Sequence, residues 1–524
     1  MLEQAWVRLL YAIAMCALMT ACASLPPQSG RVSSHAIEPT SDTRLGQTVL
    51  ASEAAHPGDN AFHLLPDGMD ALVARVLLSE TADRSLDLQY YIWHDDLTGR
   101  AMAASMLRAA DRGVRVRLLL DDLGTNADDD LLLALASHPN VQVRLFNPVA
   151  NRSFKRLGSA VEFFRVNRRM HNKSFIADNQ VAILGGRNIG DEYFGASSTI
   201  SFGDLDVFVH GPVVRQVSDA FDLYWNSDAA YPIQSLVGRH ADAHALASYR
   251  EALDAYLLSE AHSPYVAQTR QRIAQVIESR DASFVWGKAI LLYDDPAKIT
   301  RATDDSEGRL ISKFRALKLQ PEHELLIVSP YFVPREVGVQ WLRSMTARGV
   351  RVTVLTNSLA ATDVSAVHAG YQRYRKDMLE AGVRLYELKP VASGDGKDEN
   401  KEKKSMFGSS KASLHAKTYV FDRERIFIGS MNLDPRSVEL NTEIGVYCES
   451  AAAAREVADG IGMKIDRIAW RVELQANGDG SQHMVWIDTD ADGTTKTLEH
   501  EPDVSSFKRA TIWMLGILPI ESQL

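Results

Sequence analysis

The chain has 524 residues, of which 46% are hydrophobic and 24% are charged, a composition typical of a globular protein with two large domains or one fused pair. Its formal net charge of -10 makes it a poor electrostatic partner for nucleic acid, so a polyanionic substrate would need a local basic patch. The three cysteines, Cys16, Cys22 and Cys448, exclude a disulfide framework, because two of them lie in an N-terminal leader.

The first 22 residues have the pattern of a secretory leader. Arg8 precedes an apolar run over 9–18 that is too short to span a membrane securely, and Met-Thr-Ala leads from the end of this run to Cys22. These small residues resemble the bacterial lipobox, which implies lipidation of Cys22; a plain signal peptide and an uncleaved anchor are the alternatives. We therefore expect a lipoprotein signal over 1–22, a tether over 23–58, and a membrane-anchored lipoprotein in the bacterial cell envelope, facing the periplasm.

Strand-like and helix-like segments alternate in chain order, and the alternation occurs twice. Each half opens with an apolar strand-like stretch, at 86–93 and 325–332, and a helix-like segment follows, at 101–111 and 337–347. Each helix leads into a buried-strand pattern, RGVRVRLLLDD and RGVRVTVLTNS. This order predicts α/β units around a largely parallel sheet.

A second block is also repeated. His171 begins HNKSFIADNQVAILGGRN and His415 begins HAKTYVFDRERIFIGSMN, so both copies have the pattern H-x-K-x4-D followed by matched glycine and asparagine positions. Matches at this many offsets predict a duplicated domain, in which each copy supplies half of one site.

Composition divides the rest of the chain. Residues 241–280 look helical and polar and are expected to connect the halves, with a boundary near 285. Residues 393–411 are nearly devoid of apolar side chains and predict a mobile loop, either a lid or an inert insertion. The predicted domains are a first one at 59–285, a second at 286–475, and a C-terminal hairpin with an apolar helix at 476–524.

The repeated motif carries the residue types that phosphoryl chemistry needs. On a strand, histidine and lysine two positions apart project from the same face, so an imidazole and an ammonium point together. The ammonium can neutralise phosphate oxygens while the imidazole attacks phosphorus or protonates the leaving oxygen. The catalytic set predicted from both copies is His171, Lys173, Asp178, His415, Lys417 and Asp422.

The remaining motif positions have supporting roles in this prediction. Asp178 and Asp422 follow apolar stretches and are expected to anchor the structure near the site rather than to donate protons. Asn188 and Asn432 follow turns of small residues, where they can donate hydrogen bonds to the oxygens of a substrate phosphate.

These blocks resemble the paired HKD motifs of the phospholipase D superfamily. The resemblance implies an α/β fold of two duplicated phospholipase D-like α/β/α sandwich domains, related by a pseudo-two-fold axis, with the active site at their interface. It also implies that one histidine is phosphorylated while the other acts as general acid and then base, with no metal and no other cofactor. We assign His171 as the nucleophile and His415 as the acid/base, and leave the reverse assignment open.

Each histidine also needs a partner that fixes its tautomer. Asp206 in GDLDV and Glu443 in NTEIG lie downstream of the two motifs in apolar settings. We expect Asp206 to orient His171 and Glu443 to orient His415; the alternative is that either carboxylate only caps a strand.

Longer segments resemble the cardiolipin synthase C branch of that superfamily. They include LDLQYYIWHDD, GGRNIGDEYFG, LTNSLAATDVSAVHAGYQRYR and NLDPRS. The resemblance implies a phosphatidyltransferase that acts on phospholipid at a membrane surface, with phosphatidylglycerol as acceptor and phosphatidylethanolamine as a further candidate substrate, and no nucleic acid partner. The alternatives are a hydrolytic phospholipase D that releases phosphatidic acid, a nuclease, and a catalytically inactive envelope lipoprotein.

Three further patterns have two interpretations each. Arg165, Arg168 and Arg169 form either a headgroup-binding cluster or a solvated charge run. The apolar segment from Phe507 packs on the core or rests in a membrane interface. Residues 488–499 fit the spacing of a calcium loop, but the flanking residues predict two strands that meet at an Asp-Gly turn, so no calcium site is expected.

Overall fold

The structure is a computed structural model that describes residues 24–28, 31–125, 128–197, 201–242, 244–279, 283–390, 412–490, 492–517 and 521–523. The leader with Cys22 and the charged segment 393–411 lie outside these ranges, so the expectations about them stay predictions.

Two sheets with the same strand order form the framework of the described chain. In the first half the order is β1 (Asn60–Leu65), β8 (Asp206–His210), β6 (Val181–Gly185), β5 (Ser174–Ala177), β2 (Ser85–Tyr90), β3 (Arg115–Asp121), β4 (Val141–Phe146) and β9 (Ala230–Pro232). In the second half it is β10 (Val285–Tyr293), β17 (Ile444–Glu449), β16 (Arg425–Gly429), β15 (Lys417–Phe421), β11 (Glu324–Val328), β12 (Arg351–Asn357), β13 (Arg384–Leu388) and β18 (Ala469–Ala476). The matched orders confirm the predicted duplication.

Both sheets are mixed, so the expectation of largely parallel sheets was wrong. Within these sheets, only the central strands, β2 to β4 and β11 to β13, run parallel to one another. The strands that follow the motif histidines, β5 and β15, form hairpins with β6 and β16. A tight turn joins each hairpin, and a tight turn can only connect antiparallel strands.

Helices cover both faces of each sheet, which gives the expected α/β/α sandwiches. The first half contains α2 (Arg44–Ala55), α3 (Gly68–Thr81), α4 (Leu97–Asp111), α5 (Asp129–Ala136), α6 (Lys155–Val161), α7 (Phe163–Val166), α8 (Asp191–Phe194), α9 (Val213–Trp225), α10 (Ile233–Val237), α11 (Ala245–Ser259) and α12 (Pro264–Ser279). The second contains η1 (Pro296–Ile299), α13 (Leu310–Ala316), α14 (Arg335–Thr346), α15 (Ser365–Glu380), η2 (Arg436–Leu440), α16 (Ala451–Gly462), α17 (Ile465–Ile468), α18 (Ser506–Ile517) and η3 (Glu521–Gln523).

Sequence explains the placement of these helices. Helix α9 has Val213, Val217, Phe221 and Tyr224 on one buried stripe at helical spacing, so it lies against a sheet. Helix α4 begins where the side chain of Asp96 accepts a hydrogen bond from the backbone of Gly99. Helices α11 and α12, in the predicted connection, pack on the first half against α4 and α3.

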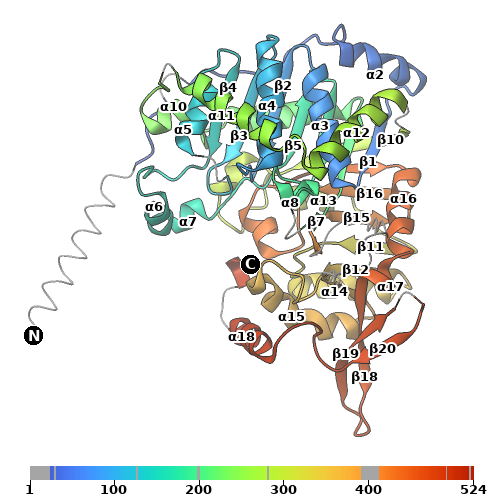
Figure 1. Cartoon of the computed structure of the whole chain (residues 1–524). Helices are drawn as coiled ribbons and strands as arrows, with labels where there is room; N and C mark the ends of the chain where they lie inside the picture. Colours follow the sequence, from blue (N-terminus) through green and yellow to red (C-terminus); the bar gives the residue numbers. More distant parts are fainter. Residues whose placement is uncertain are drawn as a thin grey trace, which may run out of the picture.

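The inner faces of the two sheets share one apolar core. Phe62 and Leu184 of the first half belong to the same buried cluster as Val328 and Ile428 of the second. Strand β10 also joins the sheets, because residues 285–287 pair with β1 and residues 288–293 pair with β17. Figure 1 shows the first half, blue to green, above the second, yellow to red, with β7 (Ser201–Gly203) and α8 at their junction.

The predicted tether over 23–58 was wrong for the residues from 31 onward, because they pack on the first half. Buried Arg117 donates to the carbonyl of Ser34 at 2.8 Å, and the Ala36 amide donates to Asp222 at 2.8 Å. Helix α2 then buries Leu45 and Val49 in the apolar core of the first half. The polar composition of this segment predicted a tether, and composition does not show contacts with residues as distant in sequence as Arg117 and Asp222.

The C-terminal part forms the predicted hairpin and helix. Strands β18, β19 (Gln482–Thr489) and β20 (Thr495–Leu498) are antiparallel neighbours, and Gly493 has the positive φ that their connecting turn requires. In the described part of this region, β19 leads into the 488–499 segment and β20 lies within it, so strands occur where the sequence predicted them. Helix α18 buries Ile512 beside α15 but exposes Trp513. Among the described residues, no helix has both the length and the hydropathy needed to cross a bilayer.

Candidate active site

The two motif histidines lie where the halves exchange backbone hydrogen bonds. The His171 amide donates to the carbonyl of Thr442 at 2.8 Å, and the His415 amide donates to the carbonyl of Gly203 at 2.8 Å. Beside His415, strand β14 (Ala412–Leu414) pairs in parallel with β7 of the other half. Each motif histidine is therefore hydrogen-bonded to a backbone segment of the opposite half. The next residue in that segment is a carboxylate, Glu443 or Asp204.

Those carboxylates bind the histidines. Nδ1 of His171 lies 2.8 Å from Oε2 of Glu443, and Nδ1 of His415 lies 2.6 Å from Oδ2 of Asp204. The predicted pairs, Asp206 with His171 and Glu443 with His415, were both wrong. Each histidine pairs with a carboxylate of the opposite half, because the backbone hydrogen bonds between the halves place that carboxylate beside it.

Asp206 has a structural role instead. Its Oδ2 accepts a hydrogen bond from Arg75 at 2.8 Å and lies 3.5 Å from Arg187, and all three side chains are buried. Asp204 and Asp206 are two residues apart around Leu205. Strand alternation alone would place them on the same face, but Asp204 lies in irregular backbone before β8, so the two side chains make different contacts.

The motif lysines lie beside the histidines and are also buried. Lys417 Nζ is 3.0 Å from Nδ1 of His415, and Lys173 Nζ donates to the backbone carbonyl of His171 at 2.6 Å. Burial lowers the pKa of Lys417 to about 8 and the pKa of Lys173 well below its usual range. An anionic ligand close to both lysines would raise these pKa values, because it would supply an opposite charge.

The two histidines have lowered pKa values for the same reasons. Burial, followed by the charges of Lys173 and Lys417, holds the pKa of His171 well below its usual range. Burial and Lys417 lower the pKa of His415 to about 4, although Asp204 opposes this effect. Without a ligand, both imidazoles are therefore neutral at pH 7.

The two orienting carboxylates differ in charge. Burial alone would raise the pKa of Asp204, but His415 and Lys417 outweigh it and hold the pKa at about 2. Burial raises the pKa of Glu443 to about 7, although Lys173 and a hydrogen bond from Ser430 act in the opposite direction. His415 thus faces a permanent anion, whereas His171 faces a group that titrates near neutrality.

The motif aspartates do not contact the histidines. Asp178 accepts hydrogen bonds from the backbone amides of Asp83, Arg84 and Ser85, and Asp422 accepts them from Glu322, His323 and Glu324. Both residues lie in the tight turns of the β5–β6 and β15–β16 hairpins with φ near +50°. Asp178 and Asp422 thus belong to the framework, in line with their expected anchoring role.

The two motif asparagines differ in how many side-chain hydrogen bonds they form within the protein. Asn188 donates to the hydroxyl of Tyr193 at 2.9 Å and accepts from the backbone amide of Ile92. The side-chain oxygen of Asn432 is buried and has no hydrogen-bond partner in the described part of the chain, and neither has Oε1 of Glu443. Phosphate binding by Asn188 and Asn432 stays a prediction.

Comparison with known proteins identifies the family. A family profile described as cardiolipin synthase, PLD-like domain, matches residues 77–225 and 317–462. Cardiolipin synthase C of Escherichia coli K12 is 41% identical over 91% of this chain and 99% of its own length. An uncharacterized protein of Helicobacter pylori 26695 is 32% identical over 84% of each chain.

The chain belongs to the cardiolipin synthase, PLD-like family. Its fold resembles the crystal structure of phosphatidylserine synthase from Haemophilus influenzae Rd KW20, with a TM-score of 0.53 and 15% identity, over 90% of this chain and 96% of that one. Each profile match contains one HKD motif, so membership rests on both halves. The protein is an enzyme of the phospholipase D type.

Aromatic residues outside the predicted set line this PLD-like site. The ring of Tyr91 lies 5.2 Å from that of His171, and the rings of Tyr193 and Phe202 lie 5.3 and 5.2 Å from that of His415. Sequence reasoning missed all three. Tyr91 and Tyr193 occur in LDLQYYIW and GDEYFG, two of the segments that carry the family resemblance, and that overlap was the available signal for their position.

The arginines before His171 do not form an open anion site. Arg169 is buried and binds Asp121 at 2.8 Å, Arg168 donates to backbone carbonyls that include that of Arg301, and Arg165 pairs with Glu162. The headgroup-binding interpretation of this cluster is therefore not supported, because its charges are used within the protein.

A possible metal-ligating group occurs elsewhere in the described residues. His94, Asp96 and Glu192 offer ligand atoms within 4.8 Å of one another. Both oxygens of Asp96 already accept backbone hydrogen bonds, from Gly99 and Asp191. Asp96 thereby fixes the starts of α4 and α8, a structural role that accounts for its position.

Proposed function

We propose that the protein is a phosphatidyltransferase that makes cardiolipin by transferring a phosphatidyl group to phosphatidylglycerol through a phospho-histidine. The observation that carries the proposal is the paired arrangement of His171 with Glu443 and His415 with Asp204 at one junction, with both motif lysines alongside. The 41% identity to cardiolipin synthase C, over nearly all of that chain, directs this chemistry to phospholipid.

His171 is the nucleophile in this proposal. Its imidazole is neutral, and Glu443 accepts the Nδ1 proton, which leaves the lone pair on Nε2 for attack. His415 is the general acid, because the ionised Asp204 stabilises an imidazolium once a phosphate binds between the lysines. The different pKa values of Glu443 and Asp204 support this assignment over its reverse.

The reaction proceeds in two steps, formation of the phospho-histidine and transfer of its phosphatidyl group to the acceptor. Nε2 of His171 forms a bond to phosphorus while the bond from phosphorus to the leaving alcohol breaks, and His415 gives that alcohol oxygen its proton. The hydroxyl of phosphatidylglycerol then gives its proton to His415, its oxygen bonds to phosphorus, and the bond to His171 breaks. Lys173 and Lys417 neutralise the non-bridging oxygens in both steps.

Product analysis tests the proposal. The purified full chain is mixed with vesicles that contain labelled phosphatidylglycerol, with and without phosphatidylethanolamine, and the lipid products are separated. We expect cardiolipin, and we expect His171→Ala and His415→Ala to lack it while the control His500→Ala, an exposed histidine, retains it. Phosphatidic acid without cardiolipin would identify a hydrolytic phospholipase D, in which water takes the acceptor position.

A nuclease and an inactive lipoprotein would each give a different result. Cleavage of DNA in place of lipid would identify a nuclease, although the net charge of -10 and the internally paired arginines disfavour it. Effects on membrane lipids that survive both histidine substitutions would identify an inactive envelope lipoprotein.

We also propose that Cys22 is lipidated and holds the enzyme at the periplasmic side of the cell envelope, where phospholipids are its partners. The small residues before Cys22 support this, and the family's lipid chemistry agrees with a membrane location. Incorporation of labelled palmitate that depends on Cys22 tests it; an unlabelled, fully soluble chain would contradict it.

A further inference from the structure

An apolar surface projects from the first half beside the motif of His171. Within eleven residues, five large hydrophobic side chains are exposed: Phe154, Leu157, Val161, Phe163 and Phe164. Phe164 is 86% exposed and Phe154 is 65% exposed. Figure 1 shows that α6 and α7, which carry four of these residues and follow directly after Phe154, lie at the edge of the first half, away from its sheet. We call these five residues the α6–α7 projection.

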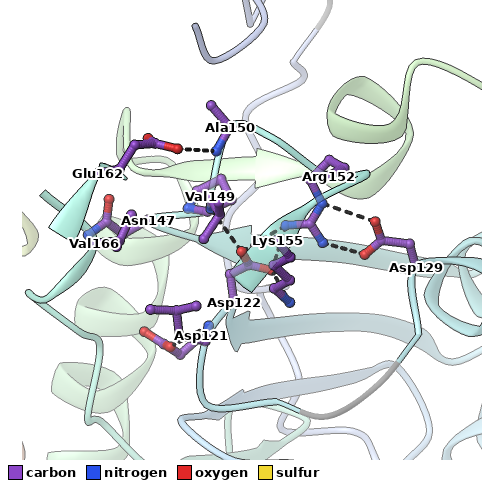
Figure 2. A network of polar contacts seen from close by, with 12 residues as sticks. Asp121, Asp122, Asp129, Asn147, Val149, Ala150, Arg152, Lys155, Glu162 and Val166 are labelled. Atoms are coloured by element: carbon purple, nitrogen blue, oxygen red, sulfur yellow. Dashed lines mark hydrogen bonds and ion pairs between the residues drawn. The ribbon is translucent and has the colours of Figure 1, made fainter. Parts of the chain in front are cut away.

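The α6–α7 projection is firmly attached at its base. Asp122, at the end of β3, accepts hydrogen bonds from the Val149 amide at 2.8 Å and from Arg152 at 2.7 Å, and it lies 2.9 Å from Lys155 (Figure 2). Arg152 also binds Asp129. These contacts hold the segment that leads into α6 against the end of β3 and the start of α5, while the apolar side chains beyond it stay exposed.

The same pair of strand-end carboxylates connects the projection to the active site. Asp121, next to Asp122, accepts hydrogen bonds from Arg169 at 2.8 Å and from the Met170 amide at 2.9 Å. His171 follows directly. The end of β3 therefore holds the projection through Asp122 and positions the backbone before His171 through Asp121.

Five large apolar side chains exposed within eleven residues indicate a surface that binds a partner or a membrane when the protein functions. The residues are aromatic and aliphatic, and the exposed Arg156 among them has no ion pair within the described residues. Aromatic side chains mixed with a free cation fit the interface of an anionic bilayer, where rings enter the acyl boundary and cations meet phosphate.

We infer that the α6–α7 projection inserts into the phospholipid bilayer and thereby holds the active site at the level of the lipid headgroups. The inference rests on the proposed function, because a substrate that is itself a bilayer lipid has to be reached from the membrane surface. It places the membrane contact at α6 and α7, whereas the sequence left the segment from Phe507 open between core packing and a membrane interface.

A local probe tests the insertion independently of catalysis. In the full chain with Cys16→Ser and Cys22→Ser, cysteines introduced by F164C, L258C or W513C each carry an environment-sensitive fluorophore; Cys448 is buried. With vesicles of phosphatidylglycerol and phosphatidylethanolamine, we expect a blue shift and quenching by spin-labelled acyl chains at position 164. Leu258, 74% exposed on α11, is the matched control and should show neither.

Activity gives the second test. The Phe154→Ser, Phe164→Ser double variant should lose at least about tenfold in turnover of vesicle lipid but retain turnover of monomeric short-chain phosphatidylglycerol. The Leu258→Ser, Met463→Ser control should retain both activities, and all variants should melt like the wild type because these side chains are exposed. Charge reversal, Arg156→Glu, should weaken binding to anionic vesicles by about tenfold.

The outcomes separate the two proposals. An unshifted probe at position 164, or insertion of position 513 in its place, overturns the inference even if cardiolipin forms. Equal losses on vesicle and short-chain lipid also overturn it, since they place the projection in the reaction rather than at the membrane. Insertion at position 164 by a chain that makes no cardiolipin supports the inference and refutes the proposed function.

Discussion

Glu443, in the second half of the chain, accepts a hydrogen bond from His171 in the first half, with 2.8 Å between Oε2 and Nδ1. The reciprocal contact joins Asp204 of the first half to His415 of the second. Each half thus lacks the group that sets the tautomer of its own motif histidine. The smallest unit that can carry out the proposed chemistry is therefore the pair.

Asp204 and Asp206 give a matched test of these contacts. We expect Asp204→Asn to lower kcat by about 10²-fold or more, because the imidazolium of His415 loses its anionic partner, and to destabilise the fold less than Asp206→Asn does. Asp206→Asn should instead destabilise the fold by about 3 to 5 kcal/mol, because Arg75 and Arg187 lose their buried anion.

Kinetics and urea unfolding of the two variants check this prediction. A result with the effects reversed would show that Asp206, and not Asp204, serves the reaction. Asp204→Glu, which keeps the charge, should recover part of the activity.

An activated substrate should distinguish the roles of the two histidines. A phosphodiester with a nitrophenol leaving group needs no general acid, so His415→Ala should still release nitrophenol in a first turnover and accumulate phosphorylated enzyme. His171→Ala should release none. Mass spectrometry of the quenched protein locates the phosphoryl group; a label on His415 in the His171→Ala variant would reverse the assigned roles.

Glu443 should control the activity on the acidic side of neutrality. Its pKa of about 7 means that the carboxylate that orients His171 forms as the pH rises through that value. We expect kcat/KM of the wild type to increase between pH 6 and 8, within about one unit of that pKa. Glu443→Gln should be less active at high pH and should lack this limb of the profile; an unchanged profile would exclude Glu443 as its source.

The titration of Glu443 should also affect the free energy of unfolding, which should fall as the pH rises while activity increases. The pKa of Glu443 is higher in the folded state than its ordinary value of 4.5, so its proton stabilises the fold. That contribution is complete below pH 4.5 and is lost as the pH rises through about 7. Its full size is on the order of 3 kcal/mol, and urea unfolding of wild type and Glu443→Gln at several pH values should show the difference narrowing as the pH falls from about 7 to 4.5 and staying constant below 4.5.

Asp178 should contribute to stability rather than to turnover. Asp178→Ala removes an acceptor from three backbone amides and a residue suited to positive φ, so we expect a loss of about 2 to 4 kcal/mol. Asp178→Asn, which tolerates the same φ, should lose less. Activity per folded molecule should be unchanged in both, and a selective fall in kcat without a change in melting temperature would return Asp178 to the catalytic set.

The sequence predicted those features that repeat within it. Matched blocks at His171 and His415 indicated the duplication, the interface site and the residue types near it, because a repeat shows which positions are equivalent. The strands at 86–93 and 325–332 had clear apolar runs and correspond to β2 and β11. Local pattern was sufficient for these features.

Contacts between distant segments could not be predicted in the same way. The sequence indicated Glu443 as an orienting group but assigned it to the wrong histidine, since a repeat does not show whether its copies exchange partners. For the same reason, residues from 31 onward looked like a tether although Arg117 and Asp222 bind their backbone. The missed Asp204 differs from the chosen Asp206 only in the backbone path that leads into β8.

Strand β10 has a consequence for how the enzyme can move. One continuous strand is hydrogen-bonded to β1 at its start and to β17 along the rest, and both sheets share an apolar core. Opening the halves like a clamshell would break these strand pairs and expose that core to water, a cost close to that of unfolding. Lipids therefore have to reach and leave the two histidines without a hinge opening between the halves, and the protein should melt in a single transition rather than half by half.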